Sequence, residues 1–277
     1  MTEAVRSESP PTGGVAPSAD KIRVEGLSYR YRRRGREDVV ALDDVDLTVG
    51  RGEFLSVVGP SGCGKSTLLR VLAGLQKPTD GLVRITREHR GRPLVAPVFQ
   101  EYSIFPWRSV EANVRLGLDA AGVDRSEARR RSQEWIERVG LAGFEKALPG
   151  NLSGGMKQRV ALARAFVVEP EILLMDEPFA ALDAQLRKVL QEELLAIVRE
   201  HAHTVFFVTH NLDEAILLSD RIALMSARPG RMRRIVDVPF PRPRSAELRK
   251  NPEFVRLEEE LWADLKDDVE TTEEAVR

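Results

Sequence analysis

The chain alternates between short apolar runs and longer amphipathic stretches, and this alternation predicts its secondary structure. Residues 22–31 and 41–49 alternate hydrophobic and polar positions loosely, as half-buried strands do. Residues 172–175 (ILLM) and 204–210 (TVFFVTH) are apolar runs, which is typical of parallel strands covered on both faces. The predicted strands span residues 22–31, 41–49, 53–59, 81–86, 94–100, 172–175, 204–210, 222–227 and 232–238.

Segments with helical character separate these strands. Residues 65–75 predict a helix, and residues 185–200 carry an apolar stripe that suits a helix packed on a sheet. Residues from about 110 to 149 are charged, helical in pattern and free of strand signals, which indicates a helical insert. An order of strand, helix, strand, helix predicts an α/β fold with a doubly wound sheet.

Composition narrows the classes of function. The chain has 277 residues, of which 42% are hydrophobic, and this is enough for a sizeable core. A net charge of -1 argues against nucleic acid as a partner, so the arginine-rich run at residues 29–36 is predicted to be a solvated surface turn. Cys63 is the single cysteine, so an intrachain disulfide is excluded.

The two ends of the chain differ from its middle. Residues 1–20 are rich in Pro, Gly, Ser and Ala and are predicted to be a disordered tail, and residues 266–277 are predicted to fray. No apolar stretch approaches the roughly 20 residues that span a bilayer, and the N-terminus lacks an apolar signal core. We therefore expect a cytoplasmic chain that reaches a membrane only through a partner.

A glycine-rich turn, GPSGCGKST at residues 59–67, joins a predicted strand to a predicted helix. Glycines allow successive backbone N–H groups to point at one anion, and the helix N-terminus adds partial positive charge there. Lys65 is placed to reach the β- and γ-phosphates of a nucleotide, and the Ser66 hydroxyl to ligate Mg²⁺. The predicted nucleotide-binding residues of this turn are Gly59, Pro60, Ser61, Gly62, Cys63, Gly64, Lys65, Ser66 and Thr67.

Two adjacent carboxylates, Asp176 and Glu177, follow the apolar strand at residues 172–175. Ligands of open α/β sheets bind at the carboxyl ends of the strands, so both side chains are expected beside the glycine-rich turn. Asp176 suits the Mg²⁺ shell, and Glu177 suits a general base that activates water. A glutamate in this place indicates hydrolysis and speaks against a phosphate-loop kinase, which would exclude water.

The segment LSGGMKQR at residues 152–159 predicts a second anion site. Ser153 is expected to cap a helix whose first amides Gly154 and Gly155 leave exposed. Together with the glycine-rich turn and ILLMDEP, this segment resembles an ATP-binding cassette (ABC) ATPase, from about residue 21 to 265. Met156 is a mild departure, since many relatives have Gln there.

The resemblance implies a P-loop NTPase fold with a RecA-like core, an antiparallel β subdomain and an α-helical subdomain inserted at about residues 101–155. It also implies that two copies pair head to tail, so that the signature segment of one contacts the γ-phosphate held by the other. Asp183 would then lie at the dimer seam, and His210 would contact the γ-phosphate. Gln100 would sense Mg²⁺ and the nucleotide, beside Ser66 and Asp176.

Two features of the resemblance stay open at this point. Either Tyr31 or its neighbour Tyr29 stacks on adenine, with Tyr31 favoured. The apolar residues that follow Gln100 either pack in the core of the helical insert or receive a helix from a membrane permease, and both roles are compatible. These residues are Tyr102, Ile104, Phe105 and Trp107.

Within the family, the sequence is most similar to importer ATPases for nitrate, aliphatic sulfonates and taurine. This likeness rests on residues 101–114, 176–187 and 226–244. It implies an integral-membrane permease as partner, an extracytoplasmic substrate-binding protein as an indirect partner, and a peripheral position on the cytoplasmic face of the membrane. The alternatives are an exporter or lipoprotein-release ATPase and an ABC ATPase without a transport role.

Two expectations concern single residues with reactive side chains. A helix N-terminus lowers thiol pKa values, so alkylation of Cys63 is expected to block ATP hydrolysis and ATP to protect against it. His89, His201 and His203 match no motif and are expected to be surface residues.

Overall fold

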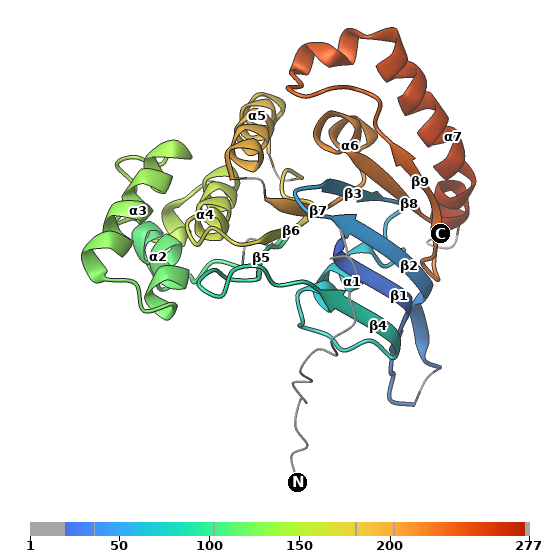
Figure 1. Cartoon of the computed structure of the whole chain (residues 1–277), viewed down its shortest axis with the longest axis horizontal. Helices are drawn as coiled ribbons and strands as arrows, with labels where there is room; N and C mark the ends of the chain where they lie inside the picture. Colours follow the sequence, from blue (N-terminus) through green and yellow to red (C-terminus); the bar gives the residue numbers. More distant parts are fainter. Residues whose placement is uncertain (1–19, 36, 102, 181, 202, 275–277) are drawn as a thin grey trace, which may run out of the picture.

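The computed structural model describes residues 20–274, except residues 36, 102, 181 and 202. The predicted tail at residues 1–20 therefore lies almost wholly outside the described residues, and so does Tyr102. Two sheets and the helices around them form the molecule, with the helices α2, α3 and α4 grouped at one side (Figure 1).

The smaller sheet is antiparallel, with the strand order β2-β1-β4. Its strands are β1 (Asp20–Tyr31), β2 (Val39–Gly50) and β4 (Asp80–Ile85). Their inward side chains, such as Ile22 and Val45, are fully buried against the larger sheet and α1. The alternation at residues 22–31 and 41–49 correctly predicted two of these strands.

The larger sheet has six strands in the order β5-β6-β7-β3-β8-β9. They are β3 (Phe54–Val58), β5 (Val95–Val98), β6 (Ile172–Asp176), β7 (Thr204–Thr209), β8 (Arg221–Met225) and β9 (Met232–Asp237). Five of them pair in parallel, while β9 pairs with β8 antiparallel. The predicted doubly wound parallel sheet is thus confirmed for five strands and carries one antiparallel edge.

The central strands are buried on both faces, as their apolar runs predicted. Every residue of β3, β6 and β7 is buried. Neighbouring side chains of β7 enter different cores, since Phe206 packs toward α1 and the small sheet while Phe207 packs toward the helical region. Because both faces of such a strand are buried in apolar cores, its residues do not alternate between polar and apolar as those of a half-exposed strand do.

Helix α1 (Lys65–Leu72) begins directly after the glycine-rich turn and lies between the two sheets. Leu68 and Leu69 are fully buried, and their core includes strands of both sheets. Because α1 is packed on both sides, its N-terminus is fixed at the carboxyl edge of β3.

The helical region consists of α2 (Val110–Ala120), α3 (Arg125–Arg138) and α4 (Gly154–Phe166). Helix α4 contacts both α2 and α3, and Trp135 of α3 stacks on Phe166 at 5.2 Å between ring centroids. The predicted insert at residues 101–155 holds α2 and α3 and stops at the first turn of α4. Because α4 packs against α2 and α3, the helical region extends to Phe166, the last residue of α4.

The remaining α-helices of the described residues are α5 (Ala184–His201), α6 (Leu212–Leu218) and α7 (Pro252–Glu274). The prediction that residues 266–277 fray is wrong for residues 266–274, which continue α7. Leu265 is buried in the α6–α7 core, and the Arg233 guanidinium lies 2.6 Å from the Asp268 carboxylate, so both contacts hold this end of the helix. None of the helices formed by the described residues is long and apolar enough to cross a membrane.

Candidate functional site

The glycine-rich turn is shaped by close backbone approaches. A Cβ at Gly59 would lie 2.5 Å from the Met225 carbonyl oxygen, so only glycine fits beside β8. Gly64 has φ of 115° and a Cβ there would lie 2.7 Å from the Ala41 carbonyl oxygen, so it is constrained both by conformation and by space. The two glycines place the turn directly before the N-terminus of α1.

Lys65 lies inside this turn with its side chain almost fully buried. Its ammonium group donates hydrogen bonds to the carbonyl oxygens of Gly59 at 2.7 Å and Pro60 at 2.9 Å. These bonds satisfy the buried charge and hold it at the centre of the turn, where an anion would be attracted.

A cleft of about 450 Å³ opens above the turn and collects most of the predicted site. Its lining comes from β1, β2, the glycine-rich turn, α1 and the loops that follow β5, β6, β7 and β8. The lining residues are Tyr31, Ala41, Ser61, Gly62, Gly64, Lys65, Ser66, Thr67, Gln100, Glu177, His210 and Arg228. Segments nearly 200 residues apart in sequence therefore meet at one edge of the sheet.

The residues expected to hold Mg²⁺ lie together. The Ser66 hydroxyl donates a 2.9 Å hydrogen bond to Asp176, and Gln100 lines a small hollow with both of them. Burial raises the pKa of the Asp176 carboxyl. A hydroxyl, a carboxylate and an amide oxygen are hard ligands that fit Mg²⁺, which takes few protein ligands when phosphates supply others.

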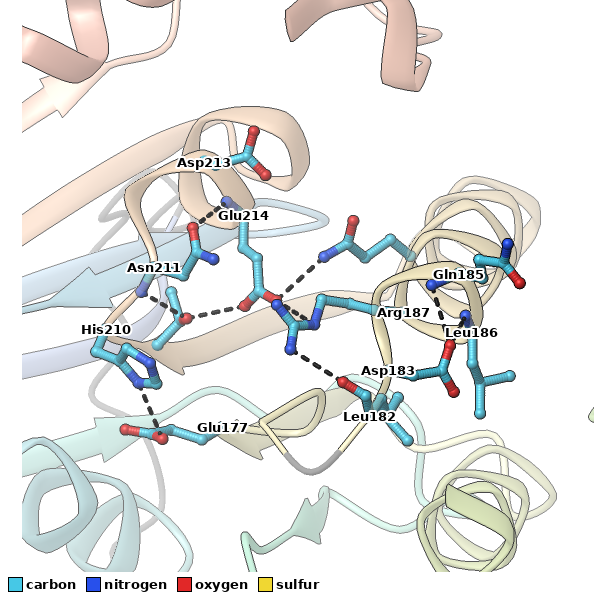
Figure 2. A network of polar contacts seen from close by, with 12 residues as sticks. Glu177, Leu182, Asp183, Gln185, Leu186, Arg187, His210, Asn211, Asp213 and Glu214 are labelled. Atoms are coloured by element: carbon cyan, nitrogen blue, oxygen red, sulfur yellow. Dashed lines mark hydrogen bonds and ion pairs between the residues drawn. The ribbon is translucent and has the colours of Figure 1, made fainter. Parts of the chain in front are cut away.

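Glu177 and His210 face each other across the cleft. Nδ1 of His210 lies 3.1 Å from a Glu177 carboxylate oxygen, and the two residues follow β6 and β7 (Figure 2). Glu177 has φ of 46°, unusual for a residue with a side chain, and its N–H donates to the Val208 carbonyl at 2.9 Å. This turn at Glu177 directs the carboxylate into the cleft instead of continuing the strand.

The structure separates the two tyrosines. The Tyr31 hydroxyl lies 3.0 Å from the Thr67 hydroxyl and the ring lines the cleft. Tyr29 instead packs against the core between the sheets, with its ring edge-on to Tyr31 at 4.9 Å between centroids. Tyr31 is therefore the tyrosine available to a base bound in the cleft.

The signature segment lies outside this cleft. Ser153 caps α4 as expected and accepts a 3.3 Å hydrogen bond from the Met156 N–H. Asp183 likewise accepts bonds from the first amides of α5, and Leu186 of α5 packs beneath Gly155. The predicted residues that lie on the surface away from the cleft are Ser153, Gly154, Gly155 and Asp183. Four others do not line the cleft itself: Asp176 lines the adjoining hollow, and Gly59, Pro60 and Cys63 belong to the glycine-rich turn.

Sequence reasoning missed Arg228. This residue follows β8, and its guanidinium donates two hydrogen bonds, at 3.3 and 3.1 Å, to the Gly62 carbonyl oxygen in the glycine-rich turn. It thereby steadies the turn from a segment 166 residues away and adds positive charge to the cleft. Its one signal in the sequence is an arginine beside Pro-Gly just after a predicted strand, at the edge where ligands bind.

The structure contradicts the surface position expected for His203, and it removes the physical basis of the Cys63 expectation. Cys63 is only 1% exposed, and burial raises the pKa of its thiol, so the effect of packing exceeds that of the helix N-terminus and of Lys65. His203 is also buried and its Nδ1 lies 2.7 Å from the Pro170 carbonyl oxygen. His89 is exposed as expected, while the side chain of His201 lies outside what the structure describes.

Comparison with known proteins agrees with this geometry. The family model described as ABC transporter matches residues 42–180, and 48% of 255 aligned residues are identical to an uncharacterized ABC transporter ATP-binding protein of Methanocaldococcus jannaschii. That alignment covers 90% of this chain and 92% of the relative. The chain belongs to the ABC transporter family and is an ABC-type ATPase, as its motifs predicted.

Relatives with more specific names are similar over most of the chain. The aliphatic sulfonates import ATP-binding protein SsuB of Bacillus licheniformis is 47% identical over 223 residues, covering 78% of this chain and 85% of SsuB. The bicarbonate transport ATP-binding protein CmpC of Synechococcus elongatus is 42% identical over 250 residues, which cover 87% of this chain and 37% of CmpC. The predicted likeness to importer ATP-binding subunits is therefore confirmed.

Solved structures support the fold. The dimeric ATP-binding cassette MJ0796, in a post-hydrolysis state bound to ADP and Pi, matches with a TM-score of 0.72 and 32% identity. The match covers 79% of this chain and 99% of that chain. The expected P-loop fold with an antiparallel β subdomain and a helical subdomain is confirmed.

Proposed function

We propose that this chain is the ATP-hydrolysing subunit of an importer that takes up a small anion or organic solute of the nitrate, sulfonate or taurine kind. The observation that carries the proposal is the cleft, in which the phosphate-binding turn meets the Glu177–His210 pair. The names of the relatives SsuB and CmpC support import of small oxyanion-bearing solutes. The chain would work on the cytoplasmic face of the membrane, bound to a separate permease.

Each side chain of the cleft has a role in binding MgATP. Tyr31 stacks on adenine, and the turn at residues 59–67 cradles the phosphates. The Lys65 ammonium exchanges its carbonyl partners for phosphate oxygens, which are stronger acceptors. Mg²⁺, held by Ser66, Gln100 and Asp176, neutralises charge on the phosphate oxygens when bound.

Hydrolysis depends on Glu177 and His210, which lie opposite the phosphate-binding turn. Glu177 accepts a proton from the attacking water as general base, and its turn backbone aims the carboxylate at the γ-phosphate position. His210 lies beside it and steadies the γ-phosphate through a ring nitrogen.

The residues outside the cleft act on a second copy of the chain. Ser153, Gly154 and Gly155 begin α4 at an exposed surface, where free helix amides bind an anion. Asp183 is exposed beside them, at the proposed dimer seam. The dimeric state of the cassette MJ0796 supports pairing of two copies.

The permease contact is proposed at the segment after Gln100. Trp107 is 72% exposed, whereas Ile104 packs against the helical core, and this division supports both roles that the sequence left open. Motion of Gln100 in the cleft would be passed along this segment to the permease. The extracytoplasmic substrate-binding protein would meet the permease and not this chain.

The experiment is affinity purification of the tagged Glu177→Gln chain from detergent-solubilised native membranes, with mass spectrometry of the proteins recovered. An integral-membrane permease in comparable amount is expected, and a binding protein encoded or recovered with it identifies the solute class. A tagged Lys65→Ala chain is the control for ATP-dependent partners. Recovery from the soluble fraction alone, or with ribosomal or nucleic-acid partners, would contradict the transport role, and an exporter permease without a binding protein would contradict import.

A further inference from the structure

A buried carboxylate outside the cleft connects two of the segments that serve it. Glu214 lies on α6 with 5% of its surface exposed. One of its carboxylate oxygens accepts a 2.9 Å hydrogen bond from the Thr209 hydroxyl, and the other accepts a 3.2 Å bond from the Gln191 amide of α5. Figure 2 shows Glu214 between His210 and Asn211 on one side and Arg187 on the other.

On the His210 side, the contacts fix the backbone around the histidine. The Thr209 hydroxyl donates to Glu214 and accepts a 3.0 Å hydrogen bond from the Asn211 N–H, so it bridges the residues before and after His210. The Asn211 side chain in turn accepts the Glu214 N–H at 3.2 Å. His210 is thus held between two anchored neighbours.

On the Asp183 side, the link runs through Arg187. Its Nη2 donates a 3.0 Å hydrogen bond to the carbonyl of Leu182, the residue before Asp183. Its Nε lies 3.8 Å from the Glu214 carboxylate, buried and without a hydrogen-bond partner among the described residues. This separation is longer than a hydrogen bond by less than about 1 Å. A small shift of the Asp183 segment would therefore bring Arg187 and Glu214 into hydrogen-bond contact.

A role in folding alone does not account for this carboxylate. Asn211 already caps α6, so the helix does not need the Glu214 side chain at its N-terminus. Burial raises the pKa of the Glu214 carboxyl, while Thr209 and Arg187 act against that rise. An apolar side chain of similar size would avoid this desolvation cost, so the carboxylate brings something that packing does not.

We propose that Glu214 is a positioning residue that couples the Asp183 segment to His210, so that contact at the dimer seam sets the histidine for hydrolysis. The inference rests on the proposed roles of His210 and Asp183. Glu214 is not among the residues that line the cleft and acts through Thr209 and Arg187.

The test is steady-state ATP hydrolysis by the full chain, with ATP affinity measured separately by equilibrium binding. Glu214→Gln keeps the size of the side chain but turns one acceptor into a donor. The kcat is expected to fall by about tenfold or more, because a misplacement of an ångström at the histidine is costly. ATP affinity is expected to change less than about twofold, since the phosphate-binding turn is untouched. Glu193→Gln is the matched control, a half-buried carboxyl of α5 outside this network.

Three further variants separate a positioning role from general damage to the fold. Adding Glu214→Gln to His210→Ala should cause no further loss of kcat, because Glu214 acts through the histidine. Thr209→Val removes the same link from the other side and should reproduce the loss even where Glu214→Gln folds poorly. Arg187→Lys tests the Asp183 arm and should also lower kcat.

Three outcomes would overturn the inference. The first is wild-type kcat in both Glu214→Gln and Thr209→Val, with a lowered kcat in His210→Ala, which leaves the proposed function standing. The second is multiplication of the losses in the double variant, which would assign Glu214 an effect independent of His210. The third is wild-type turnover in His210→Ala, which would refute the proposed role of the histidine as well.

Discussion

Glu177 illustrates how one residue depends on its backbone. Its left-handed φ of 46° ends β6 and turns the carboxylate toward His210 and the phosphate-binding turn. Asp176, one position earlier, stays in the strand and meets Ser66. Adjacent carboxylates thereby obtain different surroundings, which suits one to a metal and the other to a base.

Glu177→Gln tests the proposed base. The amide keeps the size of the side chain but cannot accept a proton, so kcat should fall by about 100-fold or more while ATP still binds. Phosphate release and nucleotide binding measure the two effects. Glu192→Gln, an exposed change on α5, should leave both unchanged. Normal turnover in Glu177→Gln would refute the base assignment.

The buried position of Cys63 predicts a slowly reacting thiol, whereas its place in the sequence beside a helix N-terminus suggested a reactive one. The thiol is buried under the glycine-rich turn and its pKa is raised, so it should react slowly with a small maleimide. We expect alkylation at pH 7 to be at least about 100-fold slower in the folded chain than after denaturation, with no added protection by ATP. Rapid labelling of the native chain that ATP slows would restore the original expectation.

At the scale of elements, one buried side chain connects the segment after Gln100 to the helical region. Asn113 of α2 is fully buried and accepts the Phe105 N–H at 2.7 Å. Its amide group donates to three carbonyl oxygens of the same loop, those of Phe105, Arg108 and Ser109. The proposed permease contact is thus attached to α2 by hydrogen bonds and not only by apolar packing.

Asn113→Ala should show the value of this attachment. The change leaves the Phe105 N–H and the Arg108 carbonyl without these partners, while the Phe105 and Ser109 carbonyls keep backbone N–H donors, so the free energy of unfolding should fall by about 2 to 4 kcal/mol. Chemical denaturation measures it. Asn151→Ala, at an exposed position, should change stability by less than about 0.5 kcal/mol. An equally small change in Asn113→Ala would show that the loop holds its conformation without this side chain.

At the scale of the whole molecule, the arrangement of the site supports the proposed pairing of two chains. The cleft holds the phosphate-binding turn, while the exposed start of α4 and Asp183 lie outside it. Each proposed catalytic centre therefore takes its turn from one copy and its signature segment from the other.

Mixing two inactive variants tests this pairing. Lys65→Ala damages the turn and Ser153→Arg damages the signature segment, so each variant alone should lack ATP turnover. A mixed dimer has one centre with both parts intact, so turnover should appear on mixing the two chains. Each variant incubated with itself is the control. Absence of turnover over a range of mixing ratios, with both chains folded, would contradict the head-to-tail dimer.

The sequence by itself determined the features that depend on short-range order. The glycine-rich turn needs a strand, particular residues and a helix in immediate succession, and all three are within residues 53–75. Strands that fill two cores carry uninterrupted apolar runs, so the central sheet was also predictable. The cap at Ser153 follows from the residues next to it.

Only the tertiary structure decided the features that depend on distant segments. Arg228 reaches Gly62 because β8 lies beside β3, and Tyr31 lines the cleft whereas Tyr29 packs against the core between the sheets. Cys63 is buried, and the packing around it raises the pKa of its thiol despite the nearby helix N-terminus. The link from Asp183 through Glu214 to His210 likewise exists only once α5, α6 and β7 pack together. Side-chain burial and long-range pairing are properties of the folded chain, and no local pattern of residues records them.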